Sequence, residues 1–275
     1  MSQTIKSMQL YPRADRIFAD LRAEGFDADD PVPVDVLNRY DQLHYHGTDA
    51  LDAAIARAGI DADHHVLEVG SGWGGCARYI AQTTGAHVTA VELQQDYNDV
   101  ARTLTDRAGL SASITHLNAD FLSADLPKDG FDHAVSWLAL FHIPDRPAYL
   151  SKLHRLIKAG GLLCAEDLYL IKSPPEAEAE EFRAHLFPNS LVSLDAYKTG
   201  LKDAGFADLA LADMTQDWSA FTAERLETFR TSRAEYENVH GSRTYQQIEL
   251  FYSKMAGYFS RGLVGGLRMS ARKDR

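Results

Sequence analysis

The middle of the chain alternates short apolar runs with longer stretches in which apolar residues recur at helical spacing. The predicted strands span 66–69, 85–92, 113–117, 131–137, 162–166, 208–212 and 262–272. Strands that alternate with helices are typical of a mostly parallel sheet, because parallel neighbours are joined by helical crossovers. An α/β core is therefore predicted for the central part of the chain.

Helical segments flank this core. The spacing of Ile17, Phe18 and Leu21 predicts a helix over 11–23, and a second short helix is expected over 34–43. An aromatic-rich helical region, broken at Gly241, follows the core. The predicted division is an N-terminal helical segment (1–46), the core (47–213), a helical insertion (214–260), and a closing strand with a tail (261–275).

One run, from Val66 to Gly75, combines a strand, an acid, a glycine-rich turn and the start of a helix predicted over 76–84. Glycines allow a sharp turn and let a ligand approach the main chain, and the helix is expected to present free N–H groups. The spacing fits G-x-G-x-x-G, the dinucleotide pattern, and also E-x-G-x-G-x-G. A dinucleotide site, a methyltransferase site and a turn without a ligand are all compatible with this run alone.

Later strands also end in polar residues. Glu92 ends the second strand at the separation expected for a carboxylate that binds ribose hydroxyls. Asp120 ends the third strand, and Gly160–Gly161 follows the helix after the fourth. Together, these ordered elements resemble the class I S-adenosylmethionine-dependent methyltransferases. Glu68 and the Asp120 segment argue against an NAD-dependent oxidoreductase.

This resemblance implies a Rossmann-like, seven-stranded, mostly parallel sheet with helices on both faces. It also implies that the last strand is the antiparallel edge strand that closes the sheet. The expected cofactor is S-adenosylmethionine, with S-adenosylhomocysteine as product. The expected cofactor-binding residues are Glu68, Gly70, Ser71, Gly72, Trp73, Glu92, Leu93, Asp120, Phe121 and Trp137.

A narrower resemblance is to the sarcosine/dimethylglycine and phosphoethanolamine N-methyltransferases. It rests on the segments 40–48, 136–142 and 262–273, and on the two late helices. Trp137 and Leu138 stand where the phosphoethanolamine enzymes carry polar residues. This departure puts a phosphorylated substrate in doubt and predicts a more apolar site.

The resemblance places candidate chemistry at the carboxyl edge of the sheet. His142 is the candidate general base, because imidazole titrates near neutral pH, and Tyr45 is expected to cover the site as part of an N-terminal lid. The expected acceptor-binding residues are Glu166, Asp167, Trp218 and Tyr252. The two acids suit a cation, and the aromatic residues belong to a helical wall of the substrate pocket.

The leading function is N-methylation of an amine in a small metabolite. Thioether S-methylation and hydroxyl O-methylation would use the same cofactor pocket, and the residues do not separate them. A catalytically silent ligand-binding protein with this fold is a further alternative.

Composition limits the partners. The chain has 275 residues and a formal net charge of −11, which argues against nonspecific binding to nucleic acid. Cys76 and Cys164 show no disulfide or metal spacing, and no metal is expected. No signal region or membrane-length apolar run is present, so we expect a cytoplasmic protein without a membrane partner. The basic residues near the C-terminus (Arg261, Arg268, Arg272, Lys273 and Arg275) are interpreted as a solvated edge. The oligomeric state is not readable from the sequence.

Overall fold

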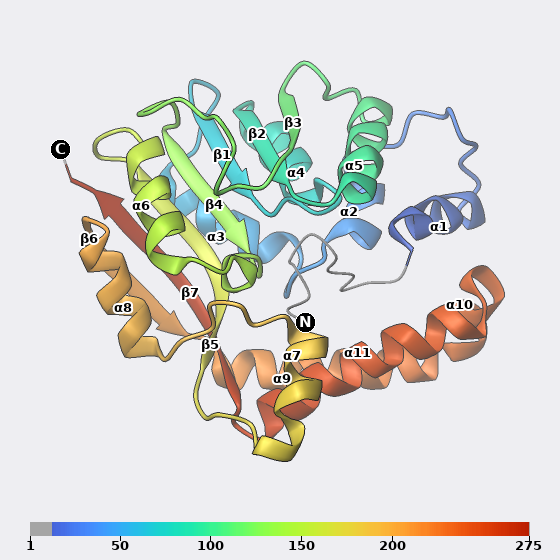
Figure 1. Ribbon diagram of the computed structural model, residues 1–275. Helices are drawn as coiled ribbons and strands as arrows, with labels where there is room; N and C mark the ends of the chain where they lie inside the picture. Colours follow the sequence, from blue (N-terminus) through green and yellow to red (C-terminus); the bar gives the residue numbers. More distant parts are fainter. Residues whose placement is uncertain (1–12, 275) are drawn as a thin grey trace.

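The computed structural model describes residues 13–274 and contains one seven-stranded sheet (Figure 1). The strands are β1 (His65–Val69), β2 (His87–Glu92), β3 (Ile114–Asn118), β4 (His133–Trp137), β5 (Leu162–Leu170), β6 (Phe206–Asp213) and β7 (Val264–Lys273). Their order is β3-β2-β1-β4-β5-β7-β6, in which β7 is antiparallel to both of its neighbours and the other pairs are parallel. The predicted Rossmann-like, mostly parallel sheet is therefore confirmed.

Helices precede, separate and follow the strands. Before β1 lie η2 (Ala14–Arg16), α1 (Ile17–Ala23), α2 (Val34–Asp41) and α3 (Thr48–Ala58). Within the sheet region lie α4 (Gly75–Thr84), α5 (Gln95–Arg107), η3 (Leu140–His142), α6 (Arg146–Leu156), η4 (Glu176–Glu178), α7 (Ala179–Leu186) and α8 (Leu194–Asp203). Between β6 and β7 lie α9 (Thr215–Thr231), α10 (Arg233–His240) and α11 (Ser242–Ser260). The first two residues of the helix predicted over 11–23 lie outside the described residues.

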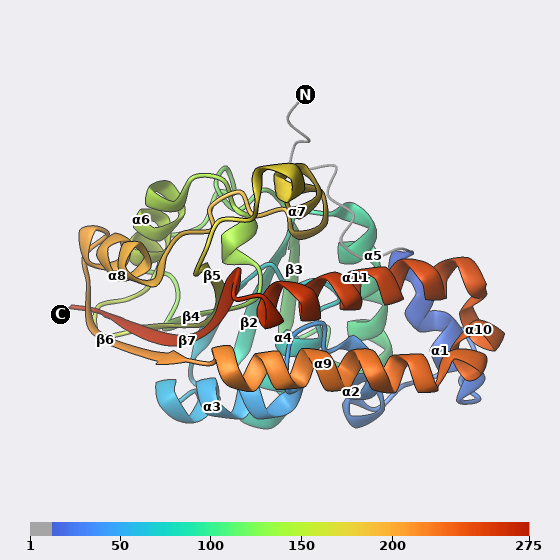
Figure 2. The same ribbon diagram turned by 90° about the horizontal axis from the view of Figure 1, so that it is seen from below.

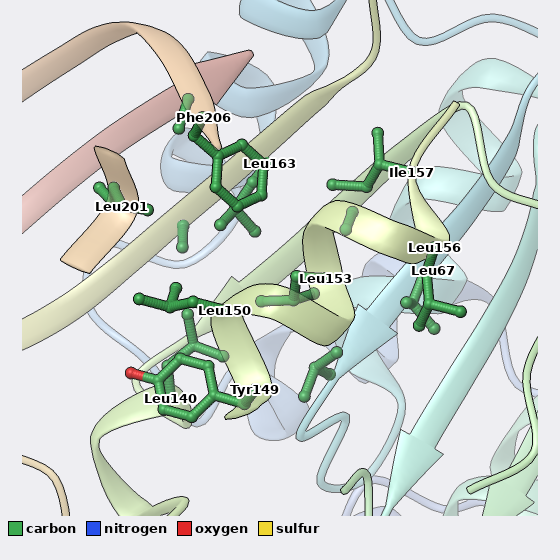
Figure 3. Close-up of a cluster of buried hydrophobic side chains, with 14 of the residues drawn as sticks. Leu67, Leu140, Tyr149, Leu150, Leu153, Leu156, Ile157, Leu163, Leu201 and Phe206 are labelled. Carbon is green, nitrogen blue, oxygen red and sulfur yellow. The ribbon is translucent and has the colours of Figure 1, made fainter. Parts of the chain in front are cut away.

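Alternate side chains of the strands build two separate cores. Val66 and Val88 pack with Ile80 of α4 and Leu51 of α3 on one face of the sheet. The opposite face carries a cluster from β1, β5, α6 and α8, drawn in Figure 3, with Leu67, Leu150, Leu153, Leu163 and Leu201 among its members. Successive residues of a strand point to opposite faces of the sheet. Because helices cover both faces, both sets of residues are buried, and the strands are nearly continuous apolar runs in the sequence.

The position of β7 corrects one expectation. The last strand does not close the sheet as its edge, because it lies between β5 and β6, and β6 forms the edge. Residues of β7 are buried along most of its length, whereas β6 shows exposed residues at alternate positions after Phe206. The burial patterns follow from this order, because β7 has a neighbouring strand on each side and the edge strand β6 has a neighbour on one side only.

Three of the C-terminal basic residues also differ from the predicted solvated edge. Arg268 donates to the Glu166 carboxylate with Nε 2.6 Å from Oε1, and Arg272 donates to the Gly160 carbonyl at 2.7 Å. Lys273 pairs with Asp129 at 2.6 Å. These three basic side chains therefore bind β7 to neighbouring parts of the core. Arg275 lies outside the described residues.

Helices α9, α10 and α11 form an elongated arm, and α9 and α11 lie side by side in both views (Figures 1 and 2). Aromatic rings fill the space between them: Phe229 stacks on Tyr245 with centroids 4.9 Å apart and meets Tyr252 edge-on at 5.2 Å. The arm contacts the N-terminal segment through His240 and Asp20, whose Nε2 and Oδ1 atoms are 2.6 Å apart. Among the helices of residues 13–274, none is both long and apolar enough to cross a bilayer.

The junction of the arm with the sheet provides a test of packing. A Cβ atom at Gly266 in β7 would lie 2.3 Å from the Trp218 ring, which is fully buried, whereas a Cβ at Gly257 in α11 would meet nothing within 4 Å. We expect Gly266→Ala to destabilise the protein by about 1–3 kcal/mol through overpacking. Gly257→Ala is the matched control and should be neutral or stabilising by about 0.5–1 kcal/mol, because Ala is the better helix former. Denaturant unfolding of both variants measures the difference, and equal effects would contradict the packing argument.

Candidate functional site

The glycine turn after β1 is held by the end of β2. The N–H groups of Gly70 and Ser71 both donate to the Val91 carbonyl, at 2.9 and 3.1 Å. Gly70 has φ +76°, and a Cβ there would lie 2.2 Å from the Ala139 Cβ, so the position requires glycine. The turn thus brings the ends of β1, β2 and β4 together at one edge of the sheet.

Glu92 fixes the next residue of this turn. Its Oε2 atom accepts the Gly72 N–H at 2.8 Å, and its Oε1 atom accepts the Gln94 N–H at 2.9 Å. The side chain nevertheless lines a cavity at this edge, and burial raises the pKa of Glu92 to about 7. A carboxylate has about four acceptor positions, so two remain for a ligand diol.

The amide groups of the turn itself are already hydrogen-bonded within the protein. Besides the three donors described above, the Gly74 N–H donates to the Ser71 carbonyl at 2.7 Å. A Cβ at Gly75 would lie 2.7 Å from Asp41 Oδ1, so a carboxyl group packs against the start of α4. A dinucleotide places its pyrophosphate at this helix terminus, and here an acid occupies that neighbourhood. The geometry therefore argues against a dinucleotide.

Glu68, the acid before the turn, is buried and lines the same cavity. Burial raises the pKa of Glu68 to about 8, and its Oε2 atom has no hydrogen-bond partner among the described residues. The buried Oγ atom of Ser71, which also lines the cavity, likewise lacks a partner there. Unsatisfied buried polar atoms are rare in folded proteins. Both atoms are therefore available to a polar group of a ligand in this cavity.

Asp41, at the end of α2, connects the N-terminal segment to this wall. Its Oδ2 atom accepts from Arg78 at 2.8 Å, and both side chains are fully buried. Arg78 also donates to Thr105 Oγ1 at 3.1 Å and to the Ala101 carbonyl at 3.3 Å. Removing one member of a buried pair leaves the other charge uncompensated. Asp41 lines the cavity and was not among the predicted site residues.

The ends of β3 and β4 complete the predicted cofactor region. Asp120 lines the cavity and accepts the Leu122 N–H at 2.9 Å through Oδ1. The indole of Trp137 lines it as well, with its centroid 5.8 Å from that of the His44 ring. The structure brings together Glu68, Gly70, Ser71, Gly72, Glu92, Leu93, Asp120, Phe121 and Trp137 around one cavity.

His142 lines the same cavity and lies in η3 after β4. Its Nδ1 atom is 3.0 Å from the Phe187 carbonyl oxygen, an acceptor, so Nδ1 carries the proton and Nε2 carries the lone pair. Burial lowers the pKa of His142 to about 4. The expected titration near neutral pH is therefore wrong: the imidazole is neutral above about pH 5 and keeps an available lone pair.

Tyr45 lines the cavity from the N-terminal segment, as predicted. Its ring meets Trp218 edge-on, with centroids 4.9 Å apart, and the Arg225 guanidinium lies 5.0 Å from its centroid. Tyr45 is only 3% exposed, and burial raises the pKa of its phenol. The segment that carries Tyr45 therefore covers the cavity by packing against the helical arm.

The two predicted substrate acids do not line this cavity. Glu166 faces a second cavity, under α3 and β6, where it pairs with Arg268. Asp167 is fully buried and accepts from the Tyr197 hydroxyl at 2.9 Å. The reason is the length of β5, which continues to Leu170 rather than ending at Glu166. Leu168, nearer the true end of the strand, lines the cavity instead.

Three predicted aromatic residues are also displaced from the cavity wall. Trp73 stacks on Tyr97 with centroids 5.9 Å apart. Trp218 lies behind Tyr45, and Tyr252 faces Phe229 within the arm. Only Tyr252 has neighbours in its own helix on the cavity wall, namely Phe251 and Met255 of α11. Tyr97, against which Trp73 packs, lines the cavity from α5, and no residue of α9 lines it. The prediction therefore identified α11 correctly but chose the wrong face of that helix, and it misplaced Trp73 and Trp218.

The other lining residues that the sequence reasoning missed are mostly apolar. They include Leu43, Leu138, Phe141, Ile143, Leu186 and Met255, together with His44 and Cys76. Leu43 and His44 belong to the 40–48 segment that carried the narrower resemblance, so that segment held the available signal. Within residues 13–274, no group of three or more His, Cys, Asp or Glu side chains is arranged to hold a metal.

Comparison with known proteins agrees with this geometry. Residues 66–161 match the methyltransferase domain family. Phosphoethanolamine N-methyltransferase 1 of Arabidopsis thaliana is 26% identical over 205 residues, covering 74% of this chain and 40% of the relative. Sarcosine/dimethylglycine N-methyltransferase of Halorhodospira halochloris is 29% identical over 155 residues, covering 56% of this chain and 55% of the relative. The chain thus spans about half the length or less of these curated relatives.

The fold has solved counterparts. The structure of Haemonchus contortus phosphoethanolamine N-methyltransferase 2, in complex with phosphomonomethylethanolamine and S-adenosylhomocysteine, superposes with a TM-score of 0.79. It is 20% identical and the match covers 86% of this chain and 55% of that one. The resemblance to S-adenosylmethionine-dependent methyltransferases, stated from the motifs, is confirmed.

The buried acid Glu68 predicts a pH dependence of stability. Its pKa rises from 4.5 to about 8 on folding, so between these values the folded state holds a proton that the unfolded state has released. Its contribution to stability is full below pH 4.5 and is lost as the pH rises through about 8. We expect the free energy of unfolding to fall by up to about 1.4 kcal/mol per pH unit in this window on account of Glu68.

Urea unfolding at several pH values between 5 and 8 measures this slope. Glu68→Gln should flatten it, whereas Glu224→Gln, at an exposed position in α9, should leave it unchanged. A slope in Glu68→Gln equal to that of the wild type would show that Glu68 is ionised in the folded protein.

Proposed function

We propose that this protein is an S-adenosylmethionine-dependent methyltransferase that acts on a small molecule, with N-methylation of an amine as the leading reaction. The observation that carries the proposal is a single cavity lined both by carboxyl groups and by a buried histidine. Glu92 and Asp120 line it with the glycine turn, which we assign to the cofactor, and His142 lines it with Tyr45 and Phe141, which we assign to the acceptor. Ligands of open α/β sheets bind at this carboxyl edge.

The residues fit the proposed cofactor. The free acceptor positions of Glu92 suit the two ribose hydroxyls, and Asp120 would accept from the adenine amino group. Glu68 Oε2 and Ser71 Oγ, both without partners among the described residues, would bind polar groups of the amino acid part. Because the amides of Gly70 to Gly72 are engaged within the protein, the turn favours a cofactor without phosphates. S-adenosylmethionine meets that requirement.

When bound, the cofactor supplies an electrophilic methyl group on a positively charged sulfur. The chain contributes alignment and exclusion of water. Tyr45, Phe141 and Leu168 enclose the acceptor end, and positioning of this kind supplies a large part of the rate of in-line displacement.

His142 is the proposed base. An ammonium or hydroxyl acceptor must lose a proton before or during attack, and the lone pair on Nε2 can take that proton. The pKa of His142, near 4, keeps this lone pair available throughout the physiological range. The proton enters at Nε2 while Nδ1–H remains bonded to the Phe187 carbonyl, which fixes the ring.

Two other acceptors are compatible with the same cavity. A hydroxyl would use His142 in the same way as an amine, whereas a thioether has no proton to lose and would need no base. A protein that binds the cofactor without transferring its methyl group is the remaining alternative. Transfer of labelled methyl groups to a metabolite panel separates catalysis from binding alone.

Cofactor binding tests the role of Glu92. Hydrogen bonds to a charged group contribute roughly 1.5–3 kcal/mol each. We therefore expect Glu92→Ala to weaken binding of S-adenosylhomocysteine at least about tenfold, as measured by calorimetry. Glu224→Ala, at an exposed position, is the control. Unchanged affinity in a folded Glu92→Ala variant would remove Glu92 from the cofactor site.

The role of His142 is tested by turnover of an identified acceptor. For an amine or alcohol, His142→Ala should lower kcat by about 10²- to 10⁴-fold with nearly unchanged cofactor affinity. His64→Ala, located just before the amino end of β1 and away from the cavity, should retain full activity.

The pH profile adds a second readout. Because the pKa of His142 is about 4, the wild-type rate should show no loss from protonation of this residue between pH 6 and 8. An amine acceptor itself becomes more reactive as the pH rises, so high pH should partly rescue His142→Ala. A small loss without rescue would indicate a thioether acceptor or a positioning role for His142.

A further inference from the structure

The acceptor end of the cavity is built from four separate parts of the chain. The N-terminal segment supplies Tyr45, η3 supplies Phe141, and α7 supplies Leu186, while α11 supplies Phe251 and Met255. Figure 2 shows α7 and α11 on the same side of the fold. Leu186 and Met255 are no more than 2% exposed, so they form a closed apolar wall. The imidazoles of His44 and His142 and the phenol of Tyr45 are polar groups that line the same cavity.

No lysine or arginine lines this cavity within the described part of the chain. Its ionisable carboxyl groups are those of Asp41, Glu68, Glu92 and Asp120. Whatever their protonation, these four groups offer no positive charge to a ligand. The electrostatic character of the whole cavity is therefore neutral to negative.

Three arginines that do not line the cavity are held by other groups of the protein. Arg78 is paired with Asp41. Arg146 donates through Nε and Nη2 to the Ser190 carbonyl, at 3.1 and 2.8 Å, and lies over the Tyr197 ring. Arg225 lies over the Tyr45 and Tyr252 rings and is not among the residues that line the cavity. Reaching the cavity would require each of these groups to abandon its present contacts.

An anionic acceptor would be poorly accommodated here. Burying a carboxylate or phosphate without a cationic partner is unfavourable, because the group loses its hydration and gains no compensating charge. The named substrates of the two relatives described above, phosphoethanolamine and sarcosine or dimethylglycine, all carry such a group. The wall of this chain lacks the chemistry that would recognise it.

An apolar amine meets the opposite situation. Its body would replace water against the rings of Tyr45, Phe141 and Phe251. Desolvation also favours the neutral form of an amine, which is the form that can attack a methyl group. The same apolar wall therefore disfavours an anion and favours the neutral amine that attacks the methyl group.

We propose that the acceptor is an apolar molecule without an anionic group, which presents one amine or hydroxyl to His142 and packs its body against Tyr45, Phe141 and Phe251. This inference rests on the proposed function and deepens it by naming the substrate class. It separates the chain from relatives that methylate phosphorylated or carboxylated amines.

Binding of matched probes tests the proposal without relying on turnover. The first measurement is calorimetry with S-adenosylhomocysteine alone, which tests the proposed function. The protein saturated with S-adenosylhomocysteine is then titrated with 2-phenylethylamine, 2-phenylethanol, phenylalanine and phosphoethanolamine. Phenylalanine differs from 2-phenylethylamine by one carboxylate, so this pair isolates the charge.

We expect 2-phenylethylamine or 2-phenylethanol to bind, and phenylalanine and phosphoethanolamine to bind at least about tenfold more weakly, in line with the cost of burying an unpaired anion. Failure of S-adenosylhomocysteine to bind would overturn the proposed function itself. If it binds, equal or tighter binding of either anionic probe, or no binding of both apolar probes, would overturn the substrate class alone.

A pair of variants checks that the missing cation is the cause. Met255→Lys adds a positive charge to the cavity wall, and Leu250→Lys adds the same charge to α11 at a position that is 45% exposed. Met255→Lys should narrow the difference between phenylalanine and 2-phenylethylamine at least about threefold, the effect of roughly 0.7 kcal/mol from one partly screened charge pair. Leu250→Lys should leave the difference in affinity between the two probes unchanged. A narrower difference in Leu250→Lys but not in Met255→Lys would contradict the proposal. If Met255→Lys fails to fold, the wild-type probe series still decides.

Discussion

The hydrogen bonds between the glycine turn after β1 and the end of β2 hold the site together. Gly70 and Ser71 donate to the Val91 carbonyl, and Gly72 donates to the Glu92 carboxylate. These bonds set how closely the turn approaches Ala139, where only a glycine at position 70 fits. Since η3 follows Ala139 directly, the same approach places His142 at the cavity. These contacts between the turn and the end of β2 therefore help to place both Glu92 and His142 at the cavity.

The buried pair of Asp41 and Arg78 extends this arrangement to the N-terminal segment. Its net contribution to stability is small when compared with a well-packed apolar pair, because two charges must be desolvated. Its geometric effect is larger: Arg78 belongs to α4, so the pair anchors the end of α2 beside the glycine turn. Tyr45 follows four residues later and reaches the cavity from that anchor. Tyr45 thus covers the site because Arg78 binds Asp41 and so holds the end of α2 beside the turn.

The sequence predicted the cofactor end of the site better than the acceptor end, for a physical reason. Glu92 is the last residue of β2 and Asp120 comes two residues after β3, and parallel strands bring their carboxyl ends to a common edge. Residues such as Phe251 and Met255 instead reach the cavity through the packing of α11, which depends on contacts distant in sequence. The sequence predicted an aromatic-rich helical region there but did not show which of its aromatic residues turn inward.

The misplacement of Glu166 and Asp167 has a related cause. A polar pair after an apolar run usually marks the end of a strand, but here β5 continues because β7 pairs with it along its full length. Arg268 of β7 supplies a counterion for Glu166, and Tyr197 of α8 supplies a hydrogen bond for Asp167. Neither partner lies near these acids in sequence. Because of this long-range pairing, Glu166 and Asp167 lie inside β5 and not at its end.

The same principle explains the polarity of the finished cavity. The arginines near it are satisfied by distant partners, Arg78 by Asp41 and Arg146 by the Ser190 carbonyl, so their charges are withdrawn from the ligand space. The carboxyl groups of Glu68 and Glu92 remain, with pKa values raised by burial to about 8 and about 7. A cationic ligand favours their ionised forms, so binding such a ligand and losing a proton from these acids are linked. A cavity of this kind stabilises positive charge at its turn end and selects an uncharged, apolar body at its other end.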